Sequence, residues 1–319
     1  MEGLRFREAG HEDYPAMLRV SAGVHNGCDF LPALFHRWVD QHNRTVLLAE
    51  LDGTAVGLIS THIVDGGETV LVQAWRVHPS CRGKGVGRLL RQYALSQARQ
   101  HHPGLRRQRY SENAAIFDSK PQTSGGGVRE VMRQTVLCFE GRSDTLVSHL
   151  PSLRHTLPTD DVTQLTPPQL HALFSDQAPL HTAIGGHVIT SDCEGYCITP
   201  SNVKLLDSGN RKVFASSTRD LTITVSHSYS VEKGLRYNID CFGRDLDSVK
   251  AHLATHMEGV TRAVDVIRFY IYVRADLLEG VRRFCAGAGL RHVFCDRQQV
   301  LVEKDFEVEM DTIPLRGSA

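Results

Sequence analysis

The residues best suited to chemistry lie close together in one short stretch, CRGKGVG, at residues 81–87. Its glycines allow the backbone to approach a ligand closely, and its arginine and lysine carry positive charge. An apolar strand precedes the stretch and an amphipathic helix follows it. The first turn of a helix leaves amide N–H groups unpaired, and these attract anions. The pattern therefore predicts a phosphate or pyrophosphate site, and the alternative is a surface turn that binds nothing.

Two common phosphate-binding motifs do not account for this stretch. The pattern G-x4-G-K-[ST] of P-loop proteins is absent, and the glycines run G-x-G-x-G rather than G-x-G-x-x-G. The preceding strands, 44–51, 54–64 and 68–79, are joined by short turns such as Asp52-Gly53, which predicts an antiparallel meander. An antiparallel meander argues against a doubly wound nucleotide-binding sheet.

The remaining elements of the first half frame the glycine-rich stretch. A short strand at 4–10 and two helices, over 11–23 and 28–42, precede the meander. The helix after the glycines should run from Val86 to His101 or His102, because apolar residues mark one of its faces. Two further strands are expected at 106–112 and 128–141, the second closing the unit.

The stretch WRVHPSCRGKGVGRLLRQYA resembles motif A of the GNAT family, the GCN5-related N-acetyltransferases. Arg82, Gly85 and Gly87 meet the pattern [QR]-x-x-G-x-[GA], and Val77 and Pro79 meet the preceding V-x-P. The resemblance covers residues 1–142 and implies an α+β GNAT fold, a mixed central sheet with flanking helices. It also implies acetyl-CoA as co-substrate, with the loop amides on the pyrophosphate and the preceding strand along the pantetheine arm. The implied acetyl-CoA-binding residues are Val77, Arg82, Gly83, Lys84, Gly85, Val86, Gly87 and Arg88.

A second resemblance extends further along the chain. The segments CDFLPALFHRW, RTVLLAELDG, DGGETVLVQAWRVHPSCRGKGVG and YNIDCFG are similar to the vertebrate histidine N-acetyltransferase group. The implied reaction moves an acetyl group from acetyl-CoA to the α-amine of L-histidine. The alternatives are an enzyme for another amino acid, a polyamine or a protein amine, or a non-catalytic acyl-CoA sensor.

Direct transfer of an acetyl group to an amine needs a proton acceptor and hydrogen-bond donors for the carbonyl oxygen. Glu68 is the carboxylate on the third meander strand and is the predicted base; the alternative is a solvent-facing residue at a hairpin end. Gln73, on the same strand, is predicted to orient a water molecule or the acetyl carbonyl, whereas Trp75 is expected to pack. In the GNAT family a tyrosine after the fifth strand often acts as the acid. The segment 113–127 has none, and Tyr93 and Tyr110 are weak substitutes.

The acceptor is expected between the first two helices and the splayed central strands. Asp29 and Phe30, in the turn between those helices, are the predicted contacts. The carboxylate could pair with an ammonium or imidazolium group, and the phenyl ring could stack on an imidazole. The alternative for Asp29 is to cap the second helix.

The second half of the chain predicts another α+β unit. A proline-rich linker and helix over 150–177 lead to strands, an amphipathic helix, and a closing helix and strand. No second glycine loop occurs, so we expect residues 1–145 to form the acetyl-CoA-binding domain. Residues 146–319 should form a GNAT-like domain without its own cofactor loop. Tyr237, Asn238 and Asp240 are candidate acceptor contacts, unless they are ordinary strand residues.

Composition narrows the class of protein. The 319 residues carry 36 basic and 36 acidic side chains, so no global field favours nucleic acid or an anionic membrane. No apolar run is long enough to span a bilayer, and the charged N-terminal residues do not resemble a signal peptide, which predicts a cytoplasmic location. The eight cysteines are scattered rather than spaced as ligands, so no metal site is expected.

Overall fold

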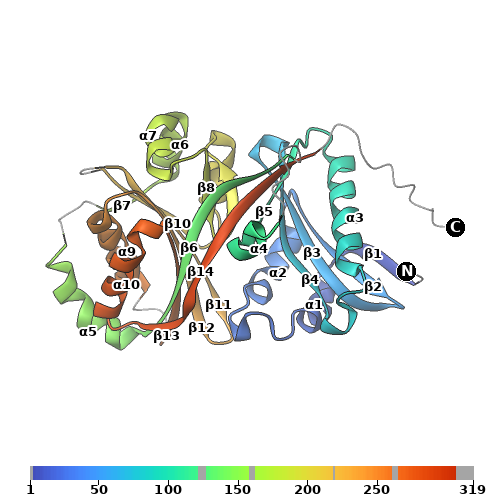
Figure 1. Ribbon diagram of the computed structural model, residues 1–319, viewed down its shortest axis with the longest axis horizontal. Helices are drawn as coiled ribbons and strands as arrows, with labels where there is room; N and C mark the ends of the chain where they lie inside the picture. The colour runs from blue at the N-terminus through green and yellow to red at the C-terminus, as the bar shows by residue number, and fades with distance from the viewer. Residues whose placement is uncertain (1–2, 121–126, 158–161, 218–219, 261–264, 307–319) are drawn as a thin grey trace.

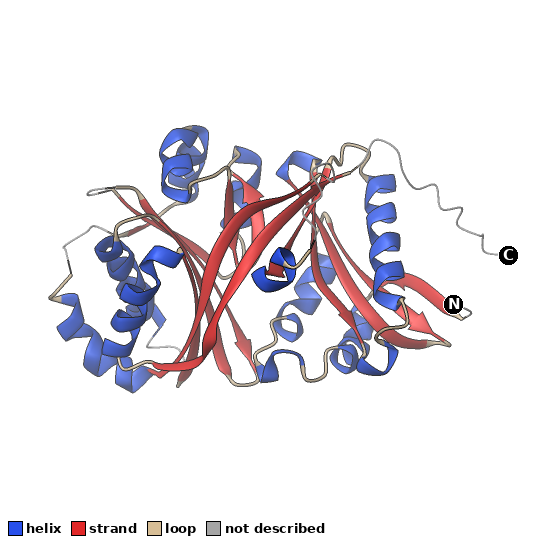
Figure 2. Ribbon diagram, in the orientation of Figure 1, coloured by secondary structure: helices blue, strands red, loops and turns tan. Residues whose placement is uncertain are grey.

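The computed structural model describes residues 3–120, 127–157, 162–217, 220–260 and 265–306, with the backbone alone at 294–296. Helices flank a long twisted sheet, and strands form the middle of the molecule (Figure 2). The elements of the first half are β1 (Leu4–Glu8), α1 (Tyr14–Val20), α2 (Leu31–Asp40), β2 (Arg44–Leu51), β3 (Thr54–Val64), β4 (Thr69–Val77), α3 (Val86–His101), β5 (Arg107–Asn113), α4 (Ala114–Asp118) and β6 (Val128–Arg142).

The predicted meander is confirmed, and its turns explain why it forms. β2 pairs antiparallel with β3, and β3 pairs antiparallel with β4. Asp52 and Gly53, between β2 and β3, both have positive φ angles (50° and 77°). That geometry matches the right-handed twist of the flanking strands and is easiest for Asp-Gly and Asn-Gly pairs. The predicted strand bounds 44–51 and 54–64 therefore agree with the structure.

The second half repeats the order of the first. A meander, β10 to β12, is followed by helix α9 and by β13, which pairs parallel with β12. The elements are α5 (Ser143–Arg154), β7 (Thr163–Gln164), α6 (Pro167–Ser175), α7 (Gln177–Ile184), β8 (Val188–Ser191), β9 (Glu194–Cys197), α8 (Val203–Leu206), β10 (Arg211–Ser216), β11 (Thr222–Val231), β12 (Gly234–Phe242), α9 (Leu246–Val260), β13 (Val266–Val273), α10 (Leu278–Gly287) and β14 (Arg291–Asp305).

The two halves exchange their last strands. The described strands form one twelve-stranded sheet in the order β1-β2-β3-β4-β5-β14-β6-β13-β12-β11-β10-β7, beside a separate β8–β9 hairpin. β14 thus lies between β5 and β6, and β6 pairs with β13 of the second half. The long strands β6 and β14 cross the middle of the molecule side by side (Figure 1). The expectation that β6 simply closes the first unit is wrong.

The segment around the expected domain boundary is helical. α5 spans Ser143–Arg154 and continues through Pro151, so the first residues of the expected linker belong to a helix. A boundary at residue 145 falls within this helix. The division into two units at that point stays a prediction.

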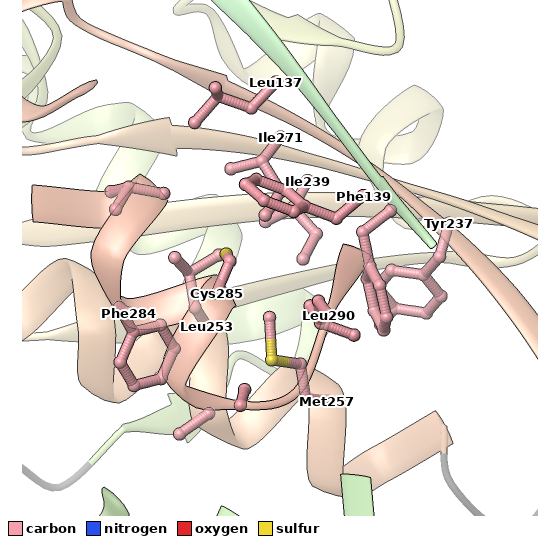
Figure 3. Packing of buried hydrophobic residues seen from close by; sticks show 14 of the residues in the cluster. Leu137, Phe139, Tyr237, Ile239, Leu253, Met257, Ile271, Phe284, Cys285 and Leu290 are labelled. Atoms are coloured by element: carbon pink, nitrogen blue, oxygen red, sulfur yellow. The ribbon is translucent and has the colours of Figure 1, made fainter. Parts of the chain in front are cut away.

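Helices cover both ends of the sheet. α3 packs on the first half through Val86, Leu90 and Ala94, which are buried against β2, β3 and β4. α5, α9 and α10 pack on one face of the second half, at the other end of the molecule (Figure 1). Phe139 and Ile239 lie in their core (Figure 3), which also contains aliphatic side chains from each of the three helices. The opposite face of the second half is covered by α6, α7, α8 and the β8–β9 hairpin.

A buried arginine joins the two halves. Arg109 on β5 has no exposed surface, and it donates to Glu303 on β14 and to Asp65 in the β3–β4 turn, the latter at 3.0 Å. It also donates to the carbonyl of Gly195 on β9 at 2.7 Å. The hairpin β8–β9 is therefore held against the β4–β5 side of the first half.

Candidate active site

A cavity of about 780 Å³ opens where β4 and β5 separate. These parallel strands pair at Thr69–Leu71 opposite Arg107–Arg109, and their later residues diverge. Helix α2, β4 and β5 line the cavity from the first half, and the β8–β9 turn and strands β10 to β13 line it from the second. Much of the cavity wall is thus supplied by the second half.

β4 is irregular where it borders the cavity. Its pairing with β3 shifts register between Leu58 and Ser60, so β4 carries one extra residue there. Ala74 adopts a left-handed backbone (φ 48°), which is uncommon for a residue other than glycine. Such a bulge redirects backbone groups and side chains and is frequent beside active sites. Gln73, the neighbouring residue, lines the cavity and accepts a 2.6 Å hydrogen bond from Arg44 Nη1.

The glycine-rich loop forms an open cradle at the N-terminus of the 16-residue helix α3. Gly83 and Gly85 have φ angles of 73° and 83°, and a Cβ atom at either position would meet nothing within 4 Å. No side chain of the described residues caps the helix. The free amide groups, together with the helix dipole, can hold an anion.

The third glycine and Arg82 fix the loop against β4. A Cβ on Gly87 would lie 3.2 Å from both Trp75 Nε1 and Val77 Cγ2, so a larger residue would have to push these side chains aside where α3 approaches β4. Trp75 donates to the carbonyl of Gly87 at 2.9 Å, and Arg82 Nε donates to the carbonyl of Val77 at 3.0 Å. Lys84 and Arg88 are exposed and have no ion-pair partner among the described residues.

The β8–β9 turn projects into the cavity from the second half. Asp192 and Cys193 both have positive φ angles (52° and 70°), a strained conformation that needs support. Ser111 on β5 supplies part of it by donating to the carbonyl of Cys193 at 2.8 Å. Asp240 supplies the rest by accepting from the amide of Asp192 at 2.9 Å. The turn is therefore fixed from both halves.

Glu194 anchors one charged cluster at the cavity wall. It accepts from Arg44 Nη2 at 2.6 Å and from Arg211 and the Tyr196 hydroxyl. Burial alone would raise the pKa of Glu194, but Arg211 and Arg44 hold that pKa well below its usual range. A carboxylate stabilised in this way is a poor proton acceptor, so its role is to fix the arginines.

Asp192 anchors a second cluster. It accepts from Arg236 Nη2 at 3.2 Å and from the Tyr229 hydroxyl at 2.8 Å, and His227 Nδ1 lies 3.5 Å away. Burial opposes ionisation, yet Arg236 and His227 lower the pKa of Asp192. Burial and Arg211 lower the pKa of His227, which keeps its ring neutral near pH 7. A guanidinium group can only donate hydrogen bonds, so His227 Nε2 accepts from Arg37 Nη2 at 3.3 Å.

His25 is a second neutral imidazole at the cavity. It lies in the 3-10 helix Val24–Gly27 between α1 and α2, with a left-handed backbone (φ 54°). Burial and the nearby guanidinium group of Arg236 lower its pKa. Among the described residues, no hydrogen-bond partner faces its ring, so one nitrogen is available to a ligand.

Comparison with known proteins identifies the family. Residues 11–115 match the model of the Acetyltransferase (GNAT) family, and residues 158–274 match the model of the histidine N-acetyltransferase C-terminal region. The chain is a GNAT-family N-acetyltransferase.

Similar proteins cover nearly the whole chain of this GNAT enzyme. The histidine N-acetyltransferase of Xenopus tropicalis is 27% identical over 87% of this chain and 87% of its own length. The human protein named probable N-acetyltransferase 16 is 29% identical over 95% of this chain and 86% of its own length. The fold is that of a GCN5-related N-acetyltransferase from Sphaerobacter thermophilus, with a TM-score of 0.56, 14% identity, and 98% of both chains covered. A tandem GNAT protein of clavulanic acid biosynthesis also matches, with a TM-score of 0.54, 14% identity, and 95% of this chain and 98% of that chain covered.

The structure places Glu68 away from the cavity of the GNAT enzyme. It lies just before β4, at the end where β4 and β5 are paired, and β-strand geometry puts it roughly 16 Å from Gln73. Its side chain is 44% exposed, with ion pairs to Arg106 (3.7 Å) and Arg107 (3.4 Å). This position contradicts a role as base and agrees with the alternative of a hairpin-end residue.

Of the two acceptor contacts predicted in the first half, one lines the cavity and the other does not. Phe30 lines the cavity, with the guanidinium carbon of Arg236 6.0 Å from its ring centroid. Asp29 is occupied instead: it accepts from both terminal nitrogens of Arg76 at 2.6 and 2.7 Å and from the amide of Leu31 at 3.2 Å. The prediction that Asp29 binds the acceptor is wrong, because its carboxylate orders the start of α2 and holds Arg76.

The candidate contacts Tyr237 and Asp240 on β12 lie on opposite faces of the sheet, because the side chains of a strand alternate between the two faces. Tyr237 faces the helices (Figure 3) and bonds with Ser226 and His256 in the core, so it does not line the cavity. Asp240 faces the other side but lies behind the cavity wall, where it accepts from Thr190 and the Asp192 amide. Burial raises the pKa of Asp240 to about 7. Both residues therefore position others and do not line the site.

The two tyrosines weighed as acids differ in position. Tyr110 lines the cavity on β5, with the Arg91 guanidinium carbon 5.1 Å from its ring. Tyr93 lies on the α3 side of the sheet and stacks on Phe6, with 4.9 Å between the ring centroids. Its role there is packing. Part of the segment without tyrosine, residues 121–126, lies outside the described residues.

Sequence reasoning missed the charged residues that the second half contributes: Asp192, Glu194, Arg211, His227 and Arg236. One signal could have found Arg236, since it precedes Asn238 and Asp240 at the period-2 spacing of one sheet face. In the part of the chain that the structure describes, no helix is long and apolar enough to cross a membrane, and no group of three or more His, Cys, Asp or Glu residues could hold a metal ion.

Proposed function

We propose that this enzyme transfers an acetyl group from acetyl-CoA to the α-amine of L-histidine. The observation that best supports this proposal is the position of the cavity. It begins at the fork where β4 and β5 diverge, beside the open N-terminus of α3, and it ends among charged residues of the second half. The match of residues 158–274 to the histidine N-acetyltransferase C-terminal model supports L-histidine as the acceptor.

The loop fits the pyrophosphate of acetyl-CoA. The amides from Gly83 to Arg88 bind it, Lys84 and Arg88 add positive charge, and the Arg82–Val77 bond keeps the loop on the end of β4. The divergence of β4 and β5 leaves backbone groups free to bind a pantetheine arm between the strands. Acetyl-CoA would supply the activated acetyl group, and the irregular backbone at Gln73–Trp75 lines the cavity in which transfer would take place.

The described residues of the second half form no such site. β12 and β13 stay paired from Leu235 opposite Ile267 to Asp240 opposite Tyr272, so no fork opens between them. The connection to α9 is short, and Asp245 accepts from the amide of Ser248 at 2.8 Å, so a carboxylate occupies the helix N-terminus. In this proposal the second half shapes the acceptor site, and acetyl-CoA binds at the glycine-rich loop of the first half.

The proton of the attacking amine goes to His25. His25 lines the cavity, its pKa lies below the usual imidazole value, and a ring nitrogen is available. The other cavity imidazole, His227, is engaged by Arg37 and Asp192. His25 replaces Glu68 as the acceptor of the proton.

Free-thiol release from acetyl-CoA tests the function against the twenty amino acids, polyamines and a peptide pool. We expect L-histidine to give the highest kcat/KM. A different preferred amine would refute histidine and keep the acetyl-CoA site. Binding of acetyl-CoA without turnover on any amine would refute catalysis and leave an acyl-CoA sensor.

Two glycine variants test the loop. Gly85→Ala forces a Cβ into a left-handed backbone at the cradle, and we expect KM for acetyl-CoA to rise about tenfold or more. Gly53→Ala is the matched control, because Gly53 has a similar φ (77°) and equally open surroundings in a distant hairpin. Both variants should lose similar stability, roughly 1–2 kcal/mol. Equal KM values in the two variants would contradict the assignment of the cradle.

A further inference from the structure

The cavity carries an excess of positive charge. Its described lining contains more cationic than anionic side chains. The cations are Arg91, Arg211, Lys233, Arg236, Arg268 and Arg297, and the anions are Asp192 and Glu194. Such a lining repels a polyamine and attracts an acceptor that carries a negative charge.

The imbalance persists in the buried part of the wall. Arg44, Arg211 and Arg236 face Asp192 and Glu194, and none of these side chains is more than 8% exposed. Three positive charges meet two negative ones, so one buried positive charge lacks a counter-ion within this cluster. A buried charge without a partner is costly, and a bound anion would remove that cost.

Neighbouring titratable groups do not restore neutrality. Burial and Arg44 lower the pKa of His62 to about 3, and the pKa of His227 is also lowered, so both rings are neutral. Burial raises the pKa of Tyr229 well above its usual value, which keeps its hydroxyl protonated. Asp240, behind Asp192, has its pKa raised to about 7 and is largely protonated below that pH. Below about pH 7 the surplus charge therefore stays positive.

The nearby ion pairs are self-contained. Arg76 is paired with Asp29 at 2.6 Å, and Arg268 is paired with Glu140 at 2.6 Å. Neither carboxylate is left over for the buried cluster.

Arg236 is the residue of the cluster that is prepared to receive an anion. Its Nε donates to Asn238 at 3.0 Å, Nη1 to the carbonyl of Cys28 at 3.1 Å, and Nη2 to Asp192 at 3.2 Å. Tyr270 covers the guanidinium group, with Cζ 4.1 Å from the ring centroid. A guanidinium group has five N–H bonds, so one on each terminal nitrogen has no acceptor among the described residues. The group is held rigidly and keeps two donors for a ligand.

We infer that Arg236 binds the α-carboxylate of the acceptor, so that the enzyme accepts free α-amino acids and rejects amines without that carboxylate. The inference rests on the proposed function and deepens it, because it names the group of the acceptor that the second half binds. Two N–H donors on one guanidinium group suit the two oxygens of a carboxylate, and a carboxylate held there fixes the α-amine, one carbon away, relative to the fork.

The test compares acceptors that differ at the carboxyl group alone. L-histidine, its methyl ester and histamine share the imidazole and the amine. In the wild type we expect kcat/KM for L-histidine to exceed that for the ester and for histamine by about 100-fold or more, because a site built for a hydrogen-bonding group rejects analogues without it.

Arg236→Met should remove this discrimination. We expect kcat/KM for L-histidine to fall about 100-fold or more, while the value for histamine changes by less than about threefold, so that the ratio approaches one. Histamine turnover also shows that the variant is folded. Arg236→Met combined with Asp192→Asn avoids an unpaired buried carboxylate and should give the same ratio if the single variant folds poorly. Lys212→Met, an exposed cation on β10, controls for net charge and should keep the wild-type ratio.

The outcomes separate the two proposals. If the wild type does not acetylate L-histidine, the proposed function fails, and the same comparison is made with whichever amino acid reacts and its methyl ester. The inference is overturned if the reacting amino acid and its ester differ by less than about threefold, or if Arg236→Met leaves their ratio unchanged. Turnover of polyamines alone would overturn both.

Discussion

At the scale of single residues, the proton acceptor is the sharpest assignment to test. His25→Asn keeps a side chain that tolerates left-handed backbone but cannot take a proton. We expect kcat/KM for the amine to fall by about 10²–10⁴-fold at pH 7. The deficit should shrink once the pH exceeds the pKa of the acceptor's own α-ammonium group, because the amine then reaches the enzyme already neutral. In the wild type, kcat/KM should fall as the pH drops through the lowered pKa of His25.

The pH profile separates chemistry from packing. A structural role for His25 would give a loss of the same size at every pH, and that result would contradict the assignment. His42→Asn is the control, since His42 is exposed between α2 and β2 and should show the wild-type profile.

Single residues also show which parts of the site a sequence can specify. The glycine loop could be predicted because positive φ favours glycine at Gly83 and Gly85, and the close approach of α3 to β4 favours it at Gly87. Glu68 could not be placed, because strand position alone does not say where two parallel strands separate. Asp192 gave no signal: its turn has positive φ angles without a glycine, so no turn motif marks it.

At the scale of elements, local signals predicted the meander, the helix after the glycine loop and the central strands. The sequence did not allow us to predict which strands pair with the two long strands, β6 and β14. The alternation of side chains sets which residues share a face, but it does not name the neighbour with which β6 or β14 pairs. The same limit explains Tyr237 and Asp240, which alternation puts on opposite faces without saying which face meets the cavity.

The contact between β5 and β14 depends on the buried arginine. Arg109→Met leaves Asp65 and Glu303 without their buried cation, and we expect the free energy of unfolding to fall by about 3–5 kcal/mol in urea titrations. Arg129→Met is the matched control. Arg129 pairs with the same Glu303 and with Asp305 but is 43% exposed, so its loss should cost less than about 1 kcal/mol. Equal losses in the two variants would show that Arg109 is not the residue that joins the halves.

At the scale of the whole molecule, the exchanged strands make each half depend on the other. Without β14, β5 and β6 have no strand between them, and without β6, β13 and β14 lose a shared neighbour. Unpaired strand edges expose backbone hydrogen-bonding groups and promote aggregation. The cavity has the same dependence, because the fork comes from the first half and Arg236 from the second. Stability and activity should therefore be properties of the complete sheet.

Splitting the chain tests this dependence directly. We expect fragments 1–157 and 158–319, expressed separately, to be aggregated or unfolded. When co-expressed, they should form a 1:1 complex that releases thiol from acetyl-CoA, because the two halves bury a continuous sheet against one another. Size-exclusion chromatography and the thiol assay would measure both properties, and the intact chain should unfold in one cooperative transition. A soluble, active fragment 1–157 would contradict this, since it would show that the first half closes its own sheet without β14.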